Sequence, residues 1–496
     1  MANNFIRIFT ALLVALVFLS CKPEEEKQSG VVGRITAAEG SSANAVVKIY
    51  KALPVEDDEY IWSVTAREEA VGFPYDVKFT YDHRTQIPEL IDTADGDGNF
   101  RFPSVVGGEY IIVAEKLGQG FTVPKQFSTS GSDVDVGELR LPRVVVYEQA
   151  YVMRQNTTWE SGSHYIIRDR TLRVDDDYTL TIEPGAIVLL AGGSSLEIDG
   201  TLVCKGTPDN FIRFMAADVL SRVPDVWQEV KIDDGASTPE FEYVSFRNGS
   251  TAINLEADSG YVRNCYFARF SAEAILAQAV GVPPMVSRCV FERIGTGIYN
   301  TSTSGFKCEN SIFQSCDPYA IKLYYLNDAE VACNWFRDCG GDDSSGSGAR
   351  GVIKLDLVTD TEIHHNHFET SFFGLQVGSR VDSTTYAHHN IFNRMYTVMY
   401  VGVTEDQRGP SNPKLAFNCF TVVDRYVINV TCNQHNTRDL EAMNNYWSTT
   451  SLNEIEQRYI HDQTDDGTCP SVMVTPILTS CNDVLTQTGT RAGLCQ

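Results

Sequence analysis

Two lysines are the side chains of this sequence best placed to take part in acid–base chemistry. Lys322 stands two residues before Tyr324, and Lys354 stands two residues before Asp356. A lysine accepts a proton at neutral pH only when burial or a neighbouring cation lowers its pKa. If the two segments lie side by side in register, each lysine supplies that neighbour to the other. The opposing interpretation is that both are solvated positions on a strand surface.

Histidines form a second candidate site. His364, His365 and His367 lie in one segment, and His388 and His389 lie in the next. Stacking in register would place His364 on His388 and His365 on His389, a spacing suited to sharing a transition-metal ion. No carboxylate or thiol occupies the same positions of these two segments. The alternative is therefore a ladder of half-exposed side chains without a metal.

A repeat of roughly 21 to 32 residues must position these groups. Its clearest mark is an aromatic residue in each copy: Phe246, Phe267, Phe291, Phe313, Phe336, Phe368, Phe392, Phe420 and Trp447. Two residues before these stand Val244, Cys265, Cys289, Ser311, Asn334, Asn366, Asn390, Asn418 and Asn445. Self-similarity of this period is typical of a solenoid, in which each coil buries its apolar face only against its neighbours.

Five successive coils thus place asparagine in one position. We expect this position to be a turn that tolerates left-handed backbone, with the asparagine side chains hydrogen-bonded along the stack. A further apolar anchor follows the aromatic residue in most coils: Ile253, Ile275, Ile298, Ile321, Leu375, Met399 and Ile428. Each coil therefore supplies short strands that pair with the same strands of the next coil, about 4.8 Å away.

The segments Thr179–Leu189 and Ser195–Thr207 alternate apolar residues between Gly and Pro turns. With the period above, they resemble the right-handed parallel β-helix repeat family of the pectate-lyase-like superfamily. The resemblance implies an all-β chain with a β-helix over residues 151–480. Residues 444–448 and 455–478 resemble the closing segment of that family and predict a cap, followed by a tail over 481–496.

Enzymes of this superfamily that resemble pectate lyases use an outer face, where a basic residue takes a proton and acidic residues hold Ca²⁺. The resemblance makes Lys322, Lys354 and Asp356 the catalytic candidates. Ligand-binding candidates on or beside the same face are Tyr299, Tyr324, Gln376, Tyr400, Asp342 and Asp343, the last two in a Gly/Ser-rich loop that protrudes before Lys354. The Gly-His-Gly and Arg-Ile-Lys motifs of polygalacturonases are absent from the sequence.

Residues 31–143 predict a separate antiparallel β-sandwich. Short alternating strands such as 45–50 and 107–114 are divided by Gly-rich turns. The segment resembles the carboxypeptidase-regulatory-like, transthyretin-like family, which implies a spacer or adhesion module, although the charged insertion 53–91 departs from it. Asp95, Asp97 and Asn99 are consistent either with a hairpin turn or with a Ca²⁺ site.

The N-terminus predicts export. Arg7 precedes the apolar stretch 8–19, which is too short to remain across a bilayer, so residues 1–20 are expected to be a cleaved signal peptide. Phe18 to Cys21 resembles a lipobox, which implies lipidation of Cys21, a tether over 21–30 and membrane contact through the lipid alone. An ordinary secretory signal is the alternative.

Twelve cysteines besides Cys21 would meet an oxidising compartment. Cys265 and Cys289 share one position of neighbouring coils and are expected to be stacked thiols, because in-register strands hold Cβ atoms farther apart than a disulfide does. Cys316 and Cys339 share another position, and either state suits them. A disulfide among the C-terminal cysteines is expected: Cys469, Cys481 and Cys495.

A net charge of −25 disfavours nucleic acid as a partner. Two functions remain. The first is a noncatalytic lipoprotein of the outer membrane or cell surface that binds polysaccharide or envelope glycan. The second is a lyase or hydrolase of acidic polysaccharide, with Ca²⁺ as the cofactor implied by the resemblance.

Overall fold

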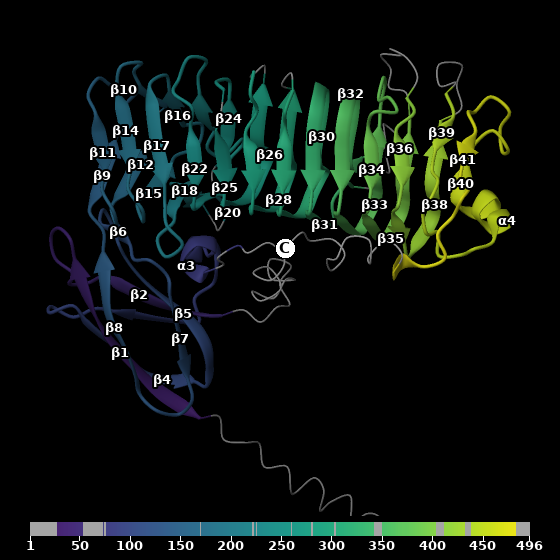
Figure 1. Ribbon diagram of the computed structural model, residues 1–496. Helices are drawn as coiled ribbons and strands as arrows, with labels where there is room; N and C mark the ends of the chain where they lie inside the picture. The colour runs from purple at the N-terminus through teal and green to yellow at the C-terminus, as the bar shows by residue number, and fades with distance from the viewer. Residues whose placement is uncertain are drawn as a thin grey trace, which may run out of the picture. The chain divides into compact units, whose positions relative to one another are not determined.

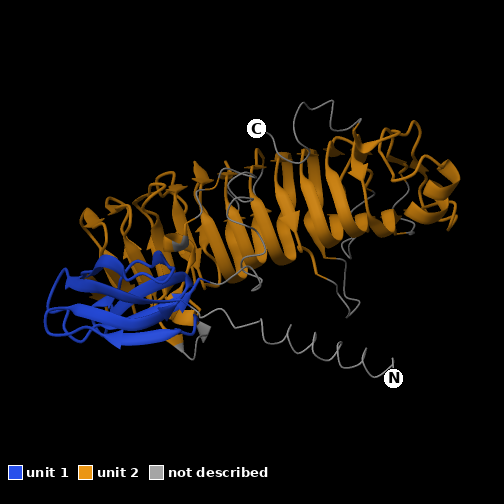
Figure 2. Ribbon diagram, turned by 90° about the horizontal axis from the view of Figure 1, so that it is seen from below, with its two compact units in different colours: residues 1–53, 86–143 blue, residues 54–85, 144–496 orange. Residues whose placement is uncertain are grey.

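The computed structural model describes residues 27–52, 73, 76–168, 170–220, 223–224, 226–258, 260–278, 281–301, 304–341, 350–402, 411–431 and 438–482. The predicted signal peptide, Cys21, Asp342 and Asp343 lie outside these residues. The chain divides into two compact units, coloured separately in Figure 2: Met1–Leu53 with Gln86–Arg143, and Pro54–Thr85 with Val144–Gln496. Each is described by itself.

The first unit contains two sheets over one core. The three-stranded sheet has the order β4-β1-β8, and the other has the order β3-β2-β5-β6 with β7 also paired to β5. Side chains from both sheets share one buried cluster, including Val31, Ile49 and Phe102. The strands are β1 (Gln28–Ala37), β2 (Val46–Lys51), β3 (Leu90–Thr93), β4 (Asn99–Val106), β5 (Gly108–Lys116), β6 (Gly120–Phe121), β7 (Lys125–Thr129) and β8 (Val134–Leu141). Because β1 begins at Gln28, the tether predicted over 21–30 extends too far.

The Asp95 motif forms the turn between β3 and β4. Asp95 Oδ1 accepts the backbone N–H groups of Asp97 (2.9 Å) and Asn99 (2.8 Å), and Gly98 adopts a left-handed φ of 85°. These hydrogen bonds, led by that from Asn99, lower the pKa of Asp95. The predicted turn is therefore confirmed, but β3 and β4 belong to different sheets, so the turn connects the two sheets and does not close a hairpin.

The second unit is a right-handed parallel β-helix, seen in Figure 1 as strands that follow one another side by side. Its strands form three parallel columns. Column A is β10 (Tyr151–Met153), β13 (Thr171–Val174), β16 (Ser195–Ile198), β21 (Val230–Ile232), β24 (Ile253–Leu255), β26 (Tyr266–Gln278), β28 (Val290–Thr301), β30 (Ile312–Ala332), β32 (Gly351–His364), β33 (His367–Val377), β35 (Ile391–Val401), β38 (Val423–Val430) and β40 (Ile460–His461).

Columns B and C complete each coil. Column B is β11 (Thr157–Trp159), β14 (Thr179–Ile182), β17 (Thr201–Lys205), β22 (Glu240–Glu242), β25 (Tyr261–Arg263), β27 (Met285–Ser287), β29 (Lys307–Glu309), the ends of β30 and β32, β34 (Tyr386–His388) and β36 (Lys414–Ala416). Column C is β9 (Val144–Tyr147), β12 (His164–Ile167), β15 (Ile187–Leu190), β18 (Ile212–Ala216), β23 (Val244–Arg247), the starts of β26, β28 and β30, β31 (Trp335–Arg337), the starts of β33 and β35, and β37 (Cys419–Phe420). A separate hairpin joins β19 (Val219–Leu220) to β20 (Val223–Pro224).

The predicted aromatic stack runs through the core. Ring centroids of successive members lie 4.4 to 5.7 Å apart, and the stack begins one coil earlier than predicted, at Phe214. The predicted apolar anchors also lie in register, from Ile253 opposite Ile275 to Met399 opposite Ile428. Both periodic predictions are confirmed.

The asparagine ladder is confirmed as well. The Oδ1 atom of Asn366 accepts the backbone N–H (2.9 Å) and the Nδ2–H (3.1 Å) of Asn334, and the pattern continues to Asn445. The left-handed residue, however, is not the asparagine but the residue before it, such as His365 with φ 56°. The reason is that the ladder asparagine points into the core with 0% exposure, whereas the bend between columns B and C is made one residue earlier.

The described cysteines include both free thiols and disulfide-bonded residues. Cys265, Cys289, Cys316 and Cys339 are buried thiols, so the stacked-thiol prediction for the first two is confirmed. Cys481 forms a disulfide with Cys419 of β37, at a Cα–Cα distance of 5.3 Å. Cys481 therefore pairs outside the C-terminal group in which a disulfide was expected, because the chain after the cap returns to the side of β37.

Part of the insertion in the front segment belongs to the β-helix unit. Residues 54–85 group with it, so the predicted sandwich over 31–143 is not one continuous segment. We call residues 76–85 together with Phe73 the clasp; it includes α3 (Val77–Thr80) and a 3₁₀ turn (His83–Thr85). Phe79 stacks on Phe211 at 4.2 Å, which fixes the clasp to the β-helix.

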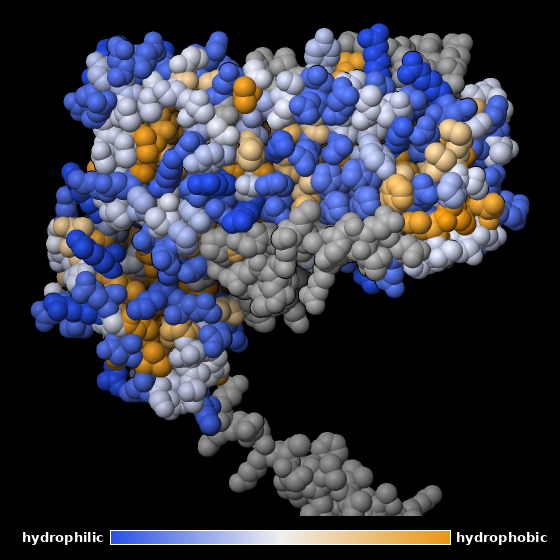
Figure 3. All heavy atoms as spheres, in the orientation of Figure 1, coloured by the Kyte–Doolittle hydropathy of each residue, from blue (hydrophilic) through white to orange (hydrophobic). Residues whose placement is uncertain are grey.

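The C-terminal end of the β-helix is covered as predicted. Helix α4 (Leu452–Glu454), a π turn (Ile455–Tyr459), β39 (Leu440–Glu441) and β41 (Val472–Met473) lie there, and Ile455, Tyr459 and Val472 join the main core. Hydrophilic residues make up most of the visible face of the β-helix in Figure 3. None of the described helices has both the length and the apolar character needed to cross a bilayer.

Candidate functional site

The lysine pair, Lys322 and Lys354, lies on column A. Register places Lys322 opposite Lys354 and also opposite Tyr299 on the other side. The Lys322 ammonium lies 3.9 Å from the centroid of the Tyr299 ring, and that of Lys354 lies 5.4 Å from the ring of Tyr319. Both lysines therefore rest on aromatic faces while remaining half-buried.

Burial and the neighbouring charge both act on Lys322. Burial of its ammonium, followed by the charge of Lys354, lowers the pKa of Lys322. Burial also raises the pKa of Tyr299, and Glu273 adds to that shift. A lysine can act as a base at neutral pH when burial and a neighbouring cation lower its pKa. Lys322 meets both requirements.

The other predicted residues of this face lie in the expected rows. Gln376 is opposite Lys354, Tyr400 is opposite Gln376, and Tyr324 is opposite Asp356. The Tyr400 hydroxyl accepts a hydrogen bond from Thr431 Oγ1 at 2.9 Å.

Two of these residues are less accessible than alternation predicted. Asp356 and Gln376 are each about 8% exposed. Asp356 Oδ1 accepts the backbone N–H of Ser379 at 2.8 Å, and Gln376 lies against Gly351 of the preceding coil, whose N–H it accepts at 3.4 Å. Both side chains therefore stabilise neighbouring backbone, and the prediction that they face solvent is wrong.

An aromatic platform adjoins the lysine pair, and of its rings only Tyr400 was predicted from the sequence. We use the term for five half-buried rings of three consecutive coils, Phe372, Phe373, Tyr396, Tyr400 and Tyr426. Phe372 stacks on Tyr396 at 4.2 Å, and Phe373 lies 5.7 Å from Tyr400. The signal in the sequence was Phe372-Phe373, two adjacent aromatic residues at a bend between strands where simple alternation does not apply.

The guanidinium of Arg425 completes the far side of the platform. It lies 5.7 Å from the centroid of Tyr396 and 5.1 Å from that of Tyr426, and its Nη1 donates to the Tyr396 hydroxyl at 3.1 Å. Column A thus carries cations at both ends of a row of aromatic rings.

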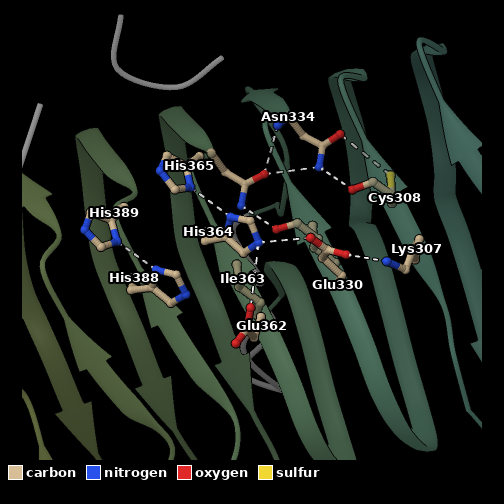
Figure 4. Close-up of polar contacts among 12 residues, drawn as sticks. Lys307, Cys308, Glu330, Asn334, Glu362, Ile363, His364, His365, His388 and His389 are labelled. Atoms are coloured by element: carbon tan, nitrogen blue, oxygen red, sulfur yellow. Dashed lines mark hydrogen bonds and ion pairs between the residues drawn. The ribbon is translucent and has the colours of Figure 1, made fainter. Parts of the chain in front are cut away.

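The histidines lie at the junction of columns B and C (Figure 4). The Nδ1 atoms of His364 and His365 are 2.8 Å apart, as are those of His388 and His389. The rings stack across coils as predicted, at 5.0 Å for His364 on His388 and 5.2 Å for His365 on His389.

Burial is the main cause of the low pKa values in this group. It lowers the pKa of His388 to about 3 and that of His365 to about 4, with smaller contributions from the other histidines. Both imidazoles are therefore neutral at neutral pH, the form that binds metals. Glu330, from the preceding coil, lies 3.2 Å from His364 Nε2, and Glu362 lies 3.9 Å from it. Sequence spacing did not reveal these carboxylates.

A pocket of about 380 Å³ opens beside the histidines. Its lining includes Glu362, Tyr386, Lys414 and Glu441. The Tyr386 ring lies 4.3 Å from the ring of His388, so Tyr386 lies between the pocket and this histidine.

A known family model covers part of the β-helix. The model of the right handed beta helix region family matches residues 232–392. The structure of Yersinia enterocolitica Family 28 exopolygalacturonase is 12% identical, covering 91% of this chain and 83% of that chain, with a TM-score of 0.20. No curated protein matches the chain.

Proposed function

We propose that the protein is a noncatalytic, lipid-anchored surface protein whose column A face binds acidic glycan. The observation that carries the proposal is the continuity of the lysine pair with the aromatic platform across neighbouring coils. Aromatic faces suit the apolar sides of sugar rings, and the lysines suit carboxylates. The front unit, whose sequence resembles the carboxypeptidase-regulatory-like family, would then serve as the spacer between the membrane and the β-helix.

The net charge of −25 repels an acidic glycan at long range, so the proposal depends on the local charge of the lysine pair. At physiological ionic strength the Debye length is about 8 Å, so distant carboxylates are screened while the local lysines are not. Binding should accordingly weaken as salt increases.

Replacing the lysine pair is expected to weaken binding of uronate-containing polysaccharide. In the double variant Lys322→Met/Lys354→Met, the dissociation constant should rise about 10- to 100-fold, since a charged hydrogen bond contributes about 1.5–3 kcal/mol. Isothermal titration with a panel of acidic and neutral polysaccharides, with and without Ca²⁺, measures this change. Tyr396→Ala should weaken binding of the same polymers.

Lys231→Met is the matched control. Lys231 lies in the same outward row several coils away, but it is paired with Asp233 and Glu256 (3.1 Å) and lies apart from the aromatic platform. Its replacement should change the dissociation constant less than twofold. Equal affinity of wild type and the double variant across the panel would refute the proposed face.

A lyase or hydrolase remains the second candidate because burial lowers the pKa of Lys322 beside Lys354. An enzyme would release unsaturated or reducing ends from an acidic polysaccharide, and Lys354→Ala would abolish these products. Binding without products supports the first function, whereas products that depend on Lys354 would replace it with the second.

Lipidation of Cys21 is expected to anchor the chain. In a bacterial host, Cys21→Ser should abolish incorporation of labelled fatty acid and release the protein from the membrane fraction. A chain that fractionates with membranes and carries no label would contradict the lipid anchor. The glycan-binding experiments use the delipidated mature chain and do not depend on this outcome.

A further inference from the structure

Two imidazole pairs stand on consecutive coils with the same local geometry. His364 is the last residue of β32, and His365 follows it with a left-handed φ of 56°; His388 and His389 repeat this arrangement with φ 54°. Successive side chains of an extended strand point to opposite faces. The left-handed residue turns the second imidazole back, and the two Nδ1 atoms come to 2.8 Å in each pair, directed at one another in Figure 4.

This separation fits two ligand atoms of one metal ion. With metal–nitrogen bonds of about 2.0–2.1 Å, two ligands at a right angle lie about 2.9 Å apart, whereas a tetrahedral angle separates them by about 3.4 Å. Right angles between nitrogen ligands are typical of Cu²⁺ and Ni²⁺, and Cu²⁺ binds most tightly in the divalent series. We propose that His364 and His365 chelate a divalent transition-metal ion through their Nδ1 atoms, with Cu²⁺ preferred.

A hydrogen-bonded chain orients His364 for this role. Glu330 Oε1 lies 3.2 Å from His364 Nε2, and Glu330 Oε2 accepts a hydrogen bond from Lys307 Nζ at 2.8 Å. A carboxylate at Nε2 holds the proton there, so the Nδ1 lone pair points to His365 and accepts its Nδ1–H at 2.8 Å in the metal-free chain. The same carboxylate–histidine arrangement orients ligands in metal sites generally. Binding requires a rotation of the rings that turns both Nδ1 lone pairs toward a common point, and the proton shared by the two Nδ1 atoms moves to His365 Nε2.

The stacked pairs are expected to hold one ion tightly and a second weakly. The rings of the two pairs lie 5.0 and 5.2 Å apart. Two divalent ions at such a separation repel one another strongly, and more so near a protein surface, where the effective dielectric constant is lower than that of water. Glu330 makes His364 and His365 the tighter pair.

The experiment titrates the tag-free mature chain with Cu²⁺ and, separately, Zn²⁺. Calorimetry is expected to show one tight Cu²⁺ site per chain, and electron paramagnetic resonance is expected to show coupling to two imidazole nitrogens. His365→Asn removes one ligand without disturbing the backbone, because asparagine occupies the same left-handed position at Asn264, Asn310 and Asn444.

Glu330→Gln should raise the dissociation constant for Cu²⁺ about 10- to 100-fold, the usual effect of removing such a partner, and His365→Asn should raise it further. His461→Gln, on the distant strand β40, is the control and should change the constant less than twofold. Wild-type Cu²⁺ affinity in folded His365→Asn, or a resonance spectrum without nitrogen coupling, would overturn the proposal. If His365→Asn does not fold, unchanged affinity in Glu330→Gln overturns it instead.

Discussion

Replacement of Asn390 by alanine is expected to lower the free energy of unfolding by about 3–6 kcal/mol. The Oδ1 atom of Asn390 accepts the backbone N–H and the Nδ2–H of Asn366, each at 3.0 Å. Its own Nδ2 donates to Ile363 O at 2.8 Å and to Asn418 Oδ1 at 3.0 Å. All of these groups are fully buried, and each one left without a partner costs about 1–3 kcal/mol.

The effect is measured by urea denaturation followed by circular dichroism. Solenoid coils contact only their neighbours, so the variant should also lose hydrogen-exchange protection first in the coils that flank residue 390. Asn393→Ala is the control: Asn393 lies three residues further on the same coil, is half-buried and accepts a hydrogen bond from Thr421. Its replacement should cost less than about 1 kcal/mol. A similar midpoint for both variants would show that the ladder does not hold the coils together.

The stacking of the coils could be predicted because the same residue types recur at equivalent positions of successive coils. Phe291 and Phe313 occupy equivalent positions whatever the length of the intervening turn, and so do Asn366 and Asn390. A side chain buried in every coil must match its neighbours in size and hydrogen bonding, and this requirement leaves a period that can be counted. The outward row that contains Lys322 and Lys354 was predicted from the same repeat.

Contacts between different rows could not be predicted in this way. Glu330 reaches His364 from 34 residues earlier, and it stands two positions from the histidine row rather than in it. Alternation also assigned Asp356 and Gln376 to solvent, although each is buried against backbone of a neighbouring coil. Such contacts depend on how side chains lean across the sheet, which a count of intervals does not contain.

The clasp was missed for a related reason. Its residues lie within an insertion of the front unit, and nothing in their spacing links Phe79 to Phe211, which lies in the β-helix. The link depends on contacts between residues far apart in the sequence. Arg84 donates a hydrogen bond to Ala216 O at 2.7 Å, and Ser245 donates one to Phe79 O at 2.9 Å.

Replacement of Asp82 by alanine is expected to release the clasp. Asp82 is buried and forms a two-pronged ion pair with Arg84, with both distances 2.9 Å. The charges of Arg213 and Arg247 lie nearby, and burial lowers the pKa of Arg213 to about 10. Loss of the carboxylate breaks a buried ion pair among these guanidinium groups, which costs about 3–5 kcal/mol.

Hydrogen exchange of the backbone amides of residues 77–85 measures the release. These amides should exchange much faster in Asp82→Ala, while the asparagine ladder stays protected. Asp76→Ala is the control, since Asp76 lies at the exposed start of α3, where it accepts the backbone N–H of Lys78 at 2.8 Å. Its replacement should cost only about 1 kcal/mol. Unchanged exchange in Asp82→Ala would mean that aromatic packing alone holds the clasp.

The pH dependence separates the charge of Asp82 from its shape. Burial would raise the pKa of Asp82, but Arg84, His83 and Arg247 together hold it well below its usual range. A pKa that is lower in the folded state than the ordinary value of about 3.9 stabilises the clasp at pH values above 3.9, and that stabilisation is lost as the pH falls toward the folded value. The difference in clasp stability between wild type and Asp82→Asn should therefore be constant at neutral pH and shrink below about pH 4. A difference that does not vary with pH would assign the effect to shape and hydrogen bonding instead of charge.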